Sequence, residues 1–341
     1  MRERIWRCSG KSYLRPFAGA LGLRHKALSG LLQRRVCEFG WGRAFAKAAK
    51  QVKEHYGFEL PAERIRQTSL EHARRIDENV LSEGAATVLK SGGTDAVVAQ
   101  ADGSMIRLVQ NGRDKKGRRT RQVDWHECRL CAACENGSAQ AHYAATFEDV
   151  ATLGRLWSRC AESANWGTDS LVQALGDGAV WIDHQSEISF GPERWYLIDF
   201  YHVCEYLAAA SQSCALKETP KRWSGRQATL LKKGKADKVI ANLEKSLEPE
   251  GTAEDEAPVR AAWRYLSNRI DNLDYPRAIA LGLPIGTGMI ESAHGHVLQE
   301  RLKGRGMAWL RQNAQAIAQA RAYEASGKWE LYWQKSEKYA A

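Results

Sequence analysis

The spacing of apolar positions is helical from the start of the chain to about residue 95. The segment from Ala46 to Tyr56 places its apolar residues on one face of a helix. Gly57 ends this helix, and Pro61 suits the first turn of the next one, from about Glu63 to Val80. We therefore predict a helical N-terminal domain over residues 1–95.

The two helices and their short turn are typical of a helix-turn-helix, but also of an ordinary helical hairpin, which is far commoner. The second helix is basic. In a helix-turn-helix it would bring four side chains to DNA: Arg64, Arg66, Arg74 and Arg75. The pattern alone does not choose between the two interpretations.

From about residue 96 the spacing becomes that of strands separated by helices. The first strand is expected over 96–102, ends in Asp102 and continues through 107–112 toward a basic loop at 113–121. Further strands are expected at 122–130, 139–146, 170–177 and 195–199, with helices at 147–164 and 179–186. This order predicts an α/β fold with a mixed sheet flanked by helices.

A helical block follows the last strand. It covers residues 205–275 and contains an acidic stretch broken by Pro and Gly at 248–258. A loop over 282–288 then leads into a helix over 289–303. We divide the chain into a catalytic domain at 96–204 and 281–325, a helical insertion at 205–280 and a tail at 326–341.

The charge of the chain adds a partner to this picture. Its 341 residues carry a formal net charge of +10. A basic chain of this size suits either nucleic acid or an anionic substrate. The basic charge gathers at 113–121 and 232–235, and the first run offers Arg118, Arg119 and Arg121 as DNA contacts, unless it is a solvated loop.

Cysteine use and hydropathy indicate the compartment. The chain has no run of about 18 apolar residues, so we expect no membrane span. The first residues lack the apolar stretch of a signal peptide. Eight scattered cysteines in a chain of this length indicate reduced thiols. We expect a cytoplasmic protein.

Two acids follow predicted strands directly. Asp102 lies in Ala-Asp-Gly-Ser and Asp177 in Gly-Asp-Gly-Ala. A single Asp-Gly is usually only a turn. At the ends of two neighbouring strands, however, two carboxylates could hold two Mg²⁺ ions about 4 Å apart and act on a phosphodiester.

A third acid, Glu291, opens the helix after Gly-Thr-Gly. It is either a further metal ligand or an acid favoured by the helix dipole, which is worth less than about 1 kcal/mol. Three basic residues follow and could bind phosphates: Arg301, Lys303 and Arg305.

These motifs together resemble a known family. The sequence around Asp102, Asp177 and Asp199, with the Gly-x-Gly-x-x-Glu motif ending at Glu291 and its Arg-Leu-Lys-Gly tail, is similar to Kra-type insertion-sequence transposases. Those proteins belong to the DDE group related to Mutator-like elements, with a ribonuclease-H-like fold. The resemblance covers roughly residues 30–325.

The resemblance implies a function. Asp102, Asp177 and Glu291 would be the catalytic triad and would hold two Mg²⁺ or Mn²⁺ ions. The protein would bind transposon ends and target DNA near the nucleoid, as a homo-oligomer in a synaptic complex, and would cut and join DNA strands. The alternatives are an inactive or truncated transposon-derived DNA-binding protein, and a ribonuclease-H-like nuclease.

Three smaller features remain open. Asp199 could orient His202 toward DNA or the metal shell, or the pair could be structural. Cys128, Cys131 and Cys134, with His126, suggest either a zinc site or a strand with buried thiols. The family's N-terminal extension with metal-binding cysteines is reduced here to the surroundings of Cys8, so we expect a truncated copy.

Overall fold

The computed structural model describes residues 6–7, 13–14, 28–84, 89–113, 116–215 and 218–338, so Cys8 lies outside the described residues. The chain forms two compact units. Unit 1 contains Met1–Glu83, Met105–Glu127 and Gly295–Ala341. Unit 2 contains Gly84–Ser104 and Cys128–His294. The predicted insertion and all three predicted catalytic acids lie in unit 2.

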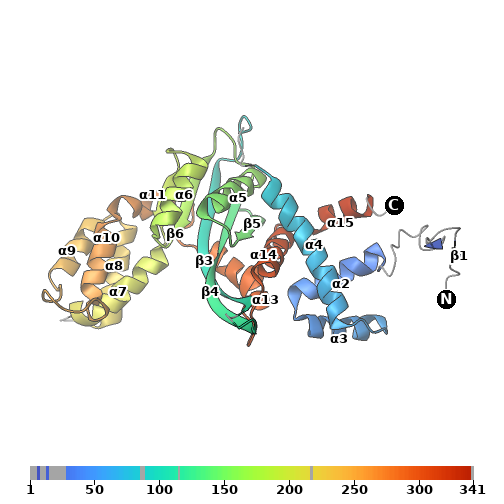
Figure 1. Ribbon diagram of the computed structural model, residues 1–341. Coiled ribbons are helices and arrows are strands. Elements are labelled where there is room, and N and C mark those ends of the chain that lie inside the picture. Colours follow the sequence, from blue (N-terminus) through green and yellow to red (C-terminus); the bar gives the residue numbers. More distant parts are fainter. Residues whose placement is uncertain are drawn as a thin grey trace. The chain divides into compact units, whose positions relative to one another are not determined.

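Unit 1 contains the predicted N-terminal helices. These are α2 (Gly30–Gly42), α3 (Phe45–Tyr56) and α4 (Ala62–Ser82), so the helices expected at 46–56 and 63–80 are confirmed (Figure 1). Their apolar faces meet in a small core of Val36, Ala48, Val52 and Ile65. Two short paired strands, β1 (Trp6–Arg7) and β2 (Tyr13–Leu14), depart from the all-helical prediction for residues 1–95.

The end of the chain completes unit 1. It forms α13 (Glu300–Leu302), α14 (Arg311–Ala325) and α15 (Trp329–Lys338). All residues of α14 from Asn313 to Ala322 are buried, and small alanines allow α14 to pack closely on α4. Arg74 of α4 donates a hydrogen bond to Asn313 (2.9 Å), and Gln315 donates one to Asp77 (2.7 Å).

Unit 2 contains most of a five-stranded mixed sheet. The strands are β3 (Ala96–Arg113), β4 (Arg119–Glu135), β5 (Ala141–Thr146), β6 (Leu171–Gly176) and β7 (Trp195–Ile198). Their order is β5-β4-β3-β6-β7. β4 and β5 are antiparallel, whereas β6 lies parallel to both β3 and β7. This is the mixed α/β sheet that was expected.

Two strands are longer than predicted. β3 runs through Asp102 to Arg113, so Asp102 lies within the strand and not at its end. β4 begins at Arg119, so residues 119–121 belong to a strand and not to a loop. The cause is strand pairing. β6 stops at Gly176, but β3 also has β4 as a neighbour, so its backbone can continue to form hydrogen bonds beyond that point. The distal parts of both strands belong to unit 1.

The predicted flanking helices are present as α5 (Val150–Ser163) and α6 (Val180–Phe190). α5 packs on β5, α6 packs on β6, and the two helices contact each other. The indole of Trp157 on α5 donates a hydrogen bond to the carbonyl of Ala132 in β4 (3.1 Å). Its ring meets Phe190 edge-on, with centroids 5.1 Å apart.

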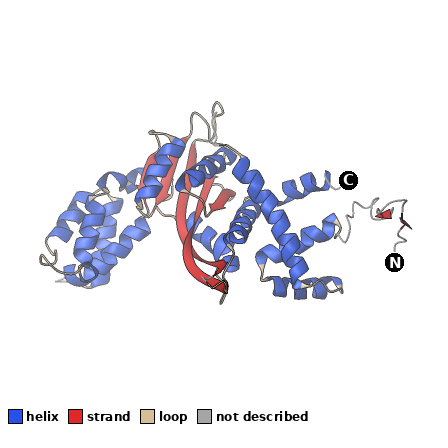
Figure 2. Ribbon diagram, in the orientation of Figure 1, coloured by secondary structure: helices blue, strands red, loops and turns tan. Residues whose placement is uncertain are grey.

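Every regular element in the described part of the predicted insertion is a helix (Figure 2). It contains α7 (Phe200–Cys214), α8 (Pro220–Lys232), α9 (Ala236–Glu244), α10 (Pro258–Ser267) and α11 (Tyr275–Ala280), with 3-10 turns at Glu254–Glu256 and Ile270–Asn272. α7 follows β7 directly and packs on α8 and α10. After the insertion, α12 (Gly288–Ala293) continues into a π-helix over His294–Gln299.

Candidate active site at the sheet edge

Strand register places the first two acids opposite each other. β3 and β6 are parallel, and their last paired residues are Gln100 and Leu175. Asp102 and Asp177 each lie two residues beyond this pair, so they occupy equivalent positions on the two chains where β6 ends. Both side chains are partly accessible to solvent. Only β6 ends there, and the juxtaposition of the two acids stays a prediction.

Two glutamines on these strands bind the loop that leads to Glu291. Gln100 of β3 accepts a hydrogen bond from the backbone N–H of Ile290 (3.0 Å) and donates one to the carbonyl of Gly286 (3.2 Å). Gln173 of β6 donates one to the carbonyl of Pro284 (2.9 Å). Both glutamines are buried, so each amide needs such partners. They hold the start of α12 against the strands that carry Asp102 and Asp177.

A third strand joins this arrangement through Asp199, which directly follows β7. One oxygen of the buried carboxylate accepts backbone hydrogen bonds from Tyr201 (2.6 Å) and His202 (3.1 Å) and caps α7. The other accepts from the backbone N–H of Thr287 (2.8 Å) and from its hydroxyl. Asp199 therefore connects the insertion to the Gly-Thr-Gly loop.

The side chain of Thr287 also reaches Glu291. Its hydroxyl oxygen lies 3.1 Å from a carboxylate oxygen of Glu291, one turn later in α12. Gly286 fits this loop because a Cβ there would lie 2.6 Å from the ring of Tyr201. Glu291 itself is exposed. Its carboxylate is thus available to a ligand at the edge of the sheet.

Of the two interpretations of Asp199 and His202, the contacts fit the structural one. Asp199 binds the backbone N–H of His202 and not its imidazole, because a helix-capping carboxylate is used up by the unpaired N–H groups of the first turn. The His202 ring instead lies 3.3 Å from Glu205 and meets Tyr206 and Tyr265 edge-on.

His294 is a residue of this site that the sequence did not single out. Its Nε2 lies 3.1 Å from Oδ2 of Asp102, without the alignment of a hydrogen bond. The imidazole is only 4% exposed, and its Nδ1 has no hydrogen-bond partner among the described residues. It lies where α12 passes into the π-helix, a local departure from helical geometry that is frequent at functional sites.

The turn after β6 is fixed by the insertion. Asp177 caps its own turn by accepting a hydrogen bond from the N–H of Ala179 (2.9 Å). Tyr265 of α10 donates to the carbonyl of Asp177 (2.5 Å), and Arg269 donates twice to the carbonyl of Gly178 (2.9 and 3.1 Å). Gly178 has φ of +87°, and a Cβ there would lie 2.7 Å from Arg269. We call Tyr265 and Arg269 the turn clamp.

Aromatic packing stabilises the turn clamp. The ring of Tyr265 stacks on Tyr206 of α7, with centroids 4.2 Å apart, and the guanidinium of Arg269 lies over the Tyr265 ring, 4.4 Å from its centroid. Burial raises the pKa of Tyr265 well above its usual value, so its hydroxyl stays protonated and able to donate. The insertion therefore determines the backbone path at the second acid.

The donor set suits magnesium in its chemistry. Asp102, Asp177 and Glu291 offer hard carboxylate oxygens, all at least partly accessible. Across the described part of the chain, however, no group of three or more His, Cys, Asp or Glu side chains is arranged to hold a metal ion. The convergence of the three acids on two metals stays a prediction.

The three cysteines of β4 lie in a strand with buried or half-buried thiols, which was the second of the two interpretations. Cys128 and Cys131 are fully buried, and the thiol of Cys131 contacts the carbonyl of Ala144 on β5 at 3.6 Å. Burial raises the pKa of Cys131 well above its usual value. Cys134 is half-buried, and burial raises its pKa also. Neutral thiols in a paired strand are poor zinc ligands.

The four arginines of α4 that were predicted to contact DNA are exposed or half-buried, and two of them form ion pairs with neighbouring glutamates. Arg66 pairs with Glu63 and Arg75 with Glu71, each about one turn away. Arg74 is exposed and donates to Asn313, and Arg64 is half-buried. Arg118, Arg119 and Arg121, and also Lys303 and Arg305, are exposed. Whether these residues bind DNA stays a prediction.

Arg301 is not available as a phosphate contact. Its side chain is only 1% exposed and donates to the carbonyl of Gly40 (3.1 Å). The guanidinium lies over the rings of Phe45 and Trp309, 4.5 Å from each centroid. Burial lowers the pKa of Arg301 to about 10. The expectation failed because a planar guanidinium can be stacked and buried in a core as well as set on a phosphate.

The sequence matches the uncharacterised protein family UPF0236 over residues 20–337. The chain belongs to this family. No curated protein matches it. Among solved structures, the fold is similar to the Drosophila P element transposase strand transfer complex, with a TM-score of 0.32 and 10% sequence identity over 92% of this chain and 82% of that chain. None of the helices in the described residues is long and apolar enough to cross a membrane.

Proposed function

We propose that this UPF0236 protein is a DNA transposase that cuts transposon ends and joins them to target DNA. The observation that supports the proposal is the sheet edge, where Asp102 and Asp177 each lie two residues beyond the last register pair of β3 and β6, and two glutamines hold the start of the Glu291 helix against the same strands. The motif resemblance to Kra-type DDE transposases supports the same three acids. Double-stranded DNA is the expected substrate, in keeping with the net charge of +10.

The roles of the residues follow from their positions. Two bound Mg²⁺ or Mn²⁺ ions would activate the attacking oxygen and stabilise the leaving oxygen of the phosphodiester. Asp102, Asp177 and Glu291 would hold them, and the exposed Glu291 would have to turn toward the two aspartates. Gln100, Gln173 and Asp199 keep the loop in place. The turn clamp fixes the backbone at Asp177.

The test is a cleavage and joining assay with linear duplexes that carry the inverted repeats flanking the coding sequence. Asp102→Asn keeps the shape of the side chain but removes its charge. We expect cleavage and joining to fall by more than about 100-fold, because removing a group that only hydrogen-bonds to a metal ligand already costs about 10–100-fold. DNA affinity should stay within about twofold, since the acid does not contact DNA.

Asp169→Asn is the matched control. Asp169 is an exposed acid that precedes β6, at the opposite end of that strand from Asp177, and its variant should retain full activity. Wild-type activity in the Asp102 variant would refute the triad. Cleavage without joining by the wild-type protein would identify a nuclease, and end binding without cleavage would identify a DNA-binding protein.

A further inference from the structure

The parts of β3 and β4 that lie in unit 1 are strongly basic. We define the ribbon tip as residues 111–113, at the end of β3, together with residues 116–121, which include the start of β4. Five of these nine residues are Lys or Arg, and none is acidic. All of its described residues are exposed. Since β4 begins at Arg119, part of this charge is fixed on a strand and is not carried by a solvated loop.

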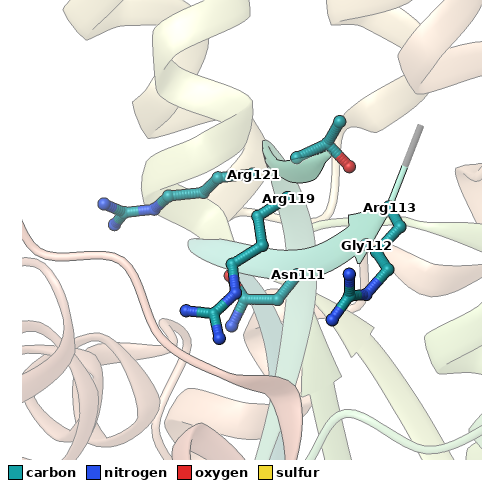
Figure 3. A pocket seen from close by; sticks show the side chains of 6 residues that line it. Asn111, Gly112, Arg113, Arg119 and Arg121 are labelled. Carbon is teal, nitrogen blue, oxygen red and sulfur yellow. The ribbon is translucent and has the colours of Figure 1, made fainter. Parts of the chain in front are cut away.

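The ribbon tip borders a pocket of about 550 Å³ that is open to solvent. Both strands line it, through Asn111, Gly112, Arg113, Arg119, Thr120 and Arg121. Figure 3 shows the three arginine side chains extending from these strands. Gly112 and Thr120 approach closely, since a Cβ on Gly112 would lie 3.1 Å from the Thr120 hydroxyl oxygen. A larger residue than glycine would therefore narrow the pocket.

The arginines of this pocket have donors to spare. Arg113 donates one hydrogen bond, to the carbonyl of Gly117 (3.0 Å). Because a guanidinium has five N–H groups, the others remain available to a ligand. Arg119 and Arg121 form no ion pair with any acid in the described part of the chain. Clustered guanidinium groups repel one another, so an anionic ligand would stabilise the tip.

An aromatic side chain shares the face of β4 that carries Arg119 and Arg121. Residues 119, 121 and 125 are separated by even numbers of positions in one continuous strand, so they point to the same side. Trp125 is 58% exposed, which is unusual for so large an apolar group. Arg107 of β3 lies over its ring, 5.9 Å from the centroid. The face therefore combines guanidinium groups with a stacking surface.

We infer that the ribbon tip binds duplex DNA, with Arg113, Arg119 and Arg121 on the sugar–phosphate backbone and Trp125 packed against the same duplex. Guanidinium groups bind phosphate oxygens through two parallel hydrogen bonds, and a two-stranded β-ribbon fits the major groove. The partner, DNA, rests on the proposed function. The pocket, the ribbon geometry and Trp125 are independent of the acids at the sheet edge.

The experiment measures binding of the full-length protein to a labelled 30-base-pair duplex of random sequence, by fluorescence anisotropy across a salt series. For Arg119→Gln with Arg121→Gln we expect about tenfold weaker binding. The slope of log affinity against log salt should fall by about two, one for each lost phosphate contact. Arg119→Lys with Arg121→Lys should keep the slope and lose only affinity, because lysine keeps the positive charge but cannot donate two parallel hydrogen bonds to a phosphate.

Lys238→Gln with Lys245→Gln is the matched control, because it removes the same charge from exposed positions on the insertion helix α9 and directly after it, outside both basic runs. It should leave affinity and slope near wild type. Circular dichroism of each variant checks the fold.

Wild-type affinity and slope in the Arg119 and Arg121 double glutamine variant would overturn the inference while leaving the proposed function standing. Tighter binding to an RNA duplex than to DNA would also overturn it, and no binding to DNA by the wild type would contradict the proposed function itself.

Discussion

At the scale of single residues, His72 shows how a buried side chain makes stability depend on pH. Its Nε2 lies 2.8 Å from the amide oxygen of Gln33, and its Nδ1 lies 2.6 Å from the hydroxyl of Tyr332. The amide oxygen can only accept, so Nε2 carries the proton and Nδ1 accepts from Tyr332. Burial, and secondly the charge of Arg75, lowers the pKa of His72 to about 4.

This shift predicts acid destabilisation. In the unfolded chain His72 takes up a proton near pH 6.5, whereas in the folded chain it does so only near pH 4. Between these values the unfolded state binds more protons, so the free energy of unfolding falls as the pH falls, by about 3 kcal/mol in all.

Urea unfolding at pH 7 and pH 5 tests this prediction. The loss in the free energy of unfolding between the two pH values should be smaller for His72→Gln than for wild type. The exposed His184→Gln should behave as wild type; an equal loss in His72→Gln would refute the assignment.

Residues also show what the sequence could predict of the site. The acids were found because Asp-Gly motifs followed apolar strands, and Glu291 because its motif resembles a family. Gln100 and Gln173 were missed, although a buried polar residue within an apolar strand always needs a partner. Their partners lie 110 or more residues away in sequence, in the loop over 284–290, so only the fold could identify them. His294 was missed for the same reason.

At the scale of elements, the turn clamp makes the insertion part of the site. Tyr265 and Arg269 hold the carbonyls of Asp177 and Gly178. Tyr265→Phe should lower the free energy of unfolding by about 1 kcal/mol, the usual worth of one hydrogen bond. If the second acid works on DNA, the cleavage rate should fall by about tenfold with DNA affinity unchanged.

Tyr206→Phe is the control for that prediction. It removes a phenol hydroxyl from the neighbouring ring but keeps the stack on Tyr265, so stability and cleavage should stay near wild type. Unfolding curves and single-turnover cleavage rates measure both effects. Equal behaviour of the two variants would show that the hydroxyl of Tyr265 does not fix the turn.

Elements were easier to predict than their ends. Every strand of the sheet and both flanking helices were expected close to where they lie, because alternation and helical spacing are local signals. The end of β3 was misplaced because Asp102-Gly103 is typical of a turn, whereas the strand continues beside β4 to Arg113. A signal from one strand cannot reveal how far its neighbour supports it.

At the scale of the whole molecule, the unit containing the N-terminal helices is closed by the end of the chain. The spacing of apolar residues predicted helices over residues 1–95, the second of them basic, but not that α4 would pack on α14. α14 carries almost no amphipathic pattern, since it is buried on all sides from Asn313 to Ala322. A buried helix of small residues gives no sign of its partner in the sequence.

This packing predicts that residues 1–95 do not fold alone. Without α14, the hydrogen bonds from Arg74 to Asn313 and from Gln315 to Asp77 are lost, and the buried face of α4, with Leu70, Ala73 and Ile76, is exposed to water. Exposing three such side chains costs several kcal/mol, roughly the whole stability of a small domain. The isolated fragment should therefore melt without a cooperative transition, as measured by circular dichroism.

A fragment that links residues 28–83 to 295–338 is the comparison and should regain helicity and a transition. A cooperative transition in 1–95 at the temperature of the full chain would show that α4 needs no partner. If the fragment fails as expected, binding by the arginines of α4 has to be measured on the full chain, because only there is that helix held in place.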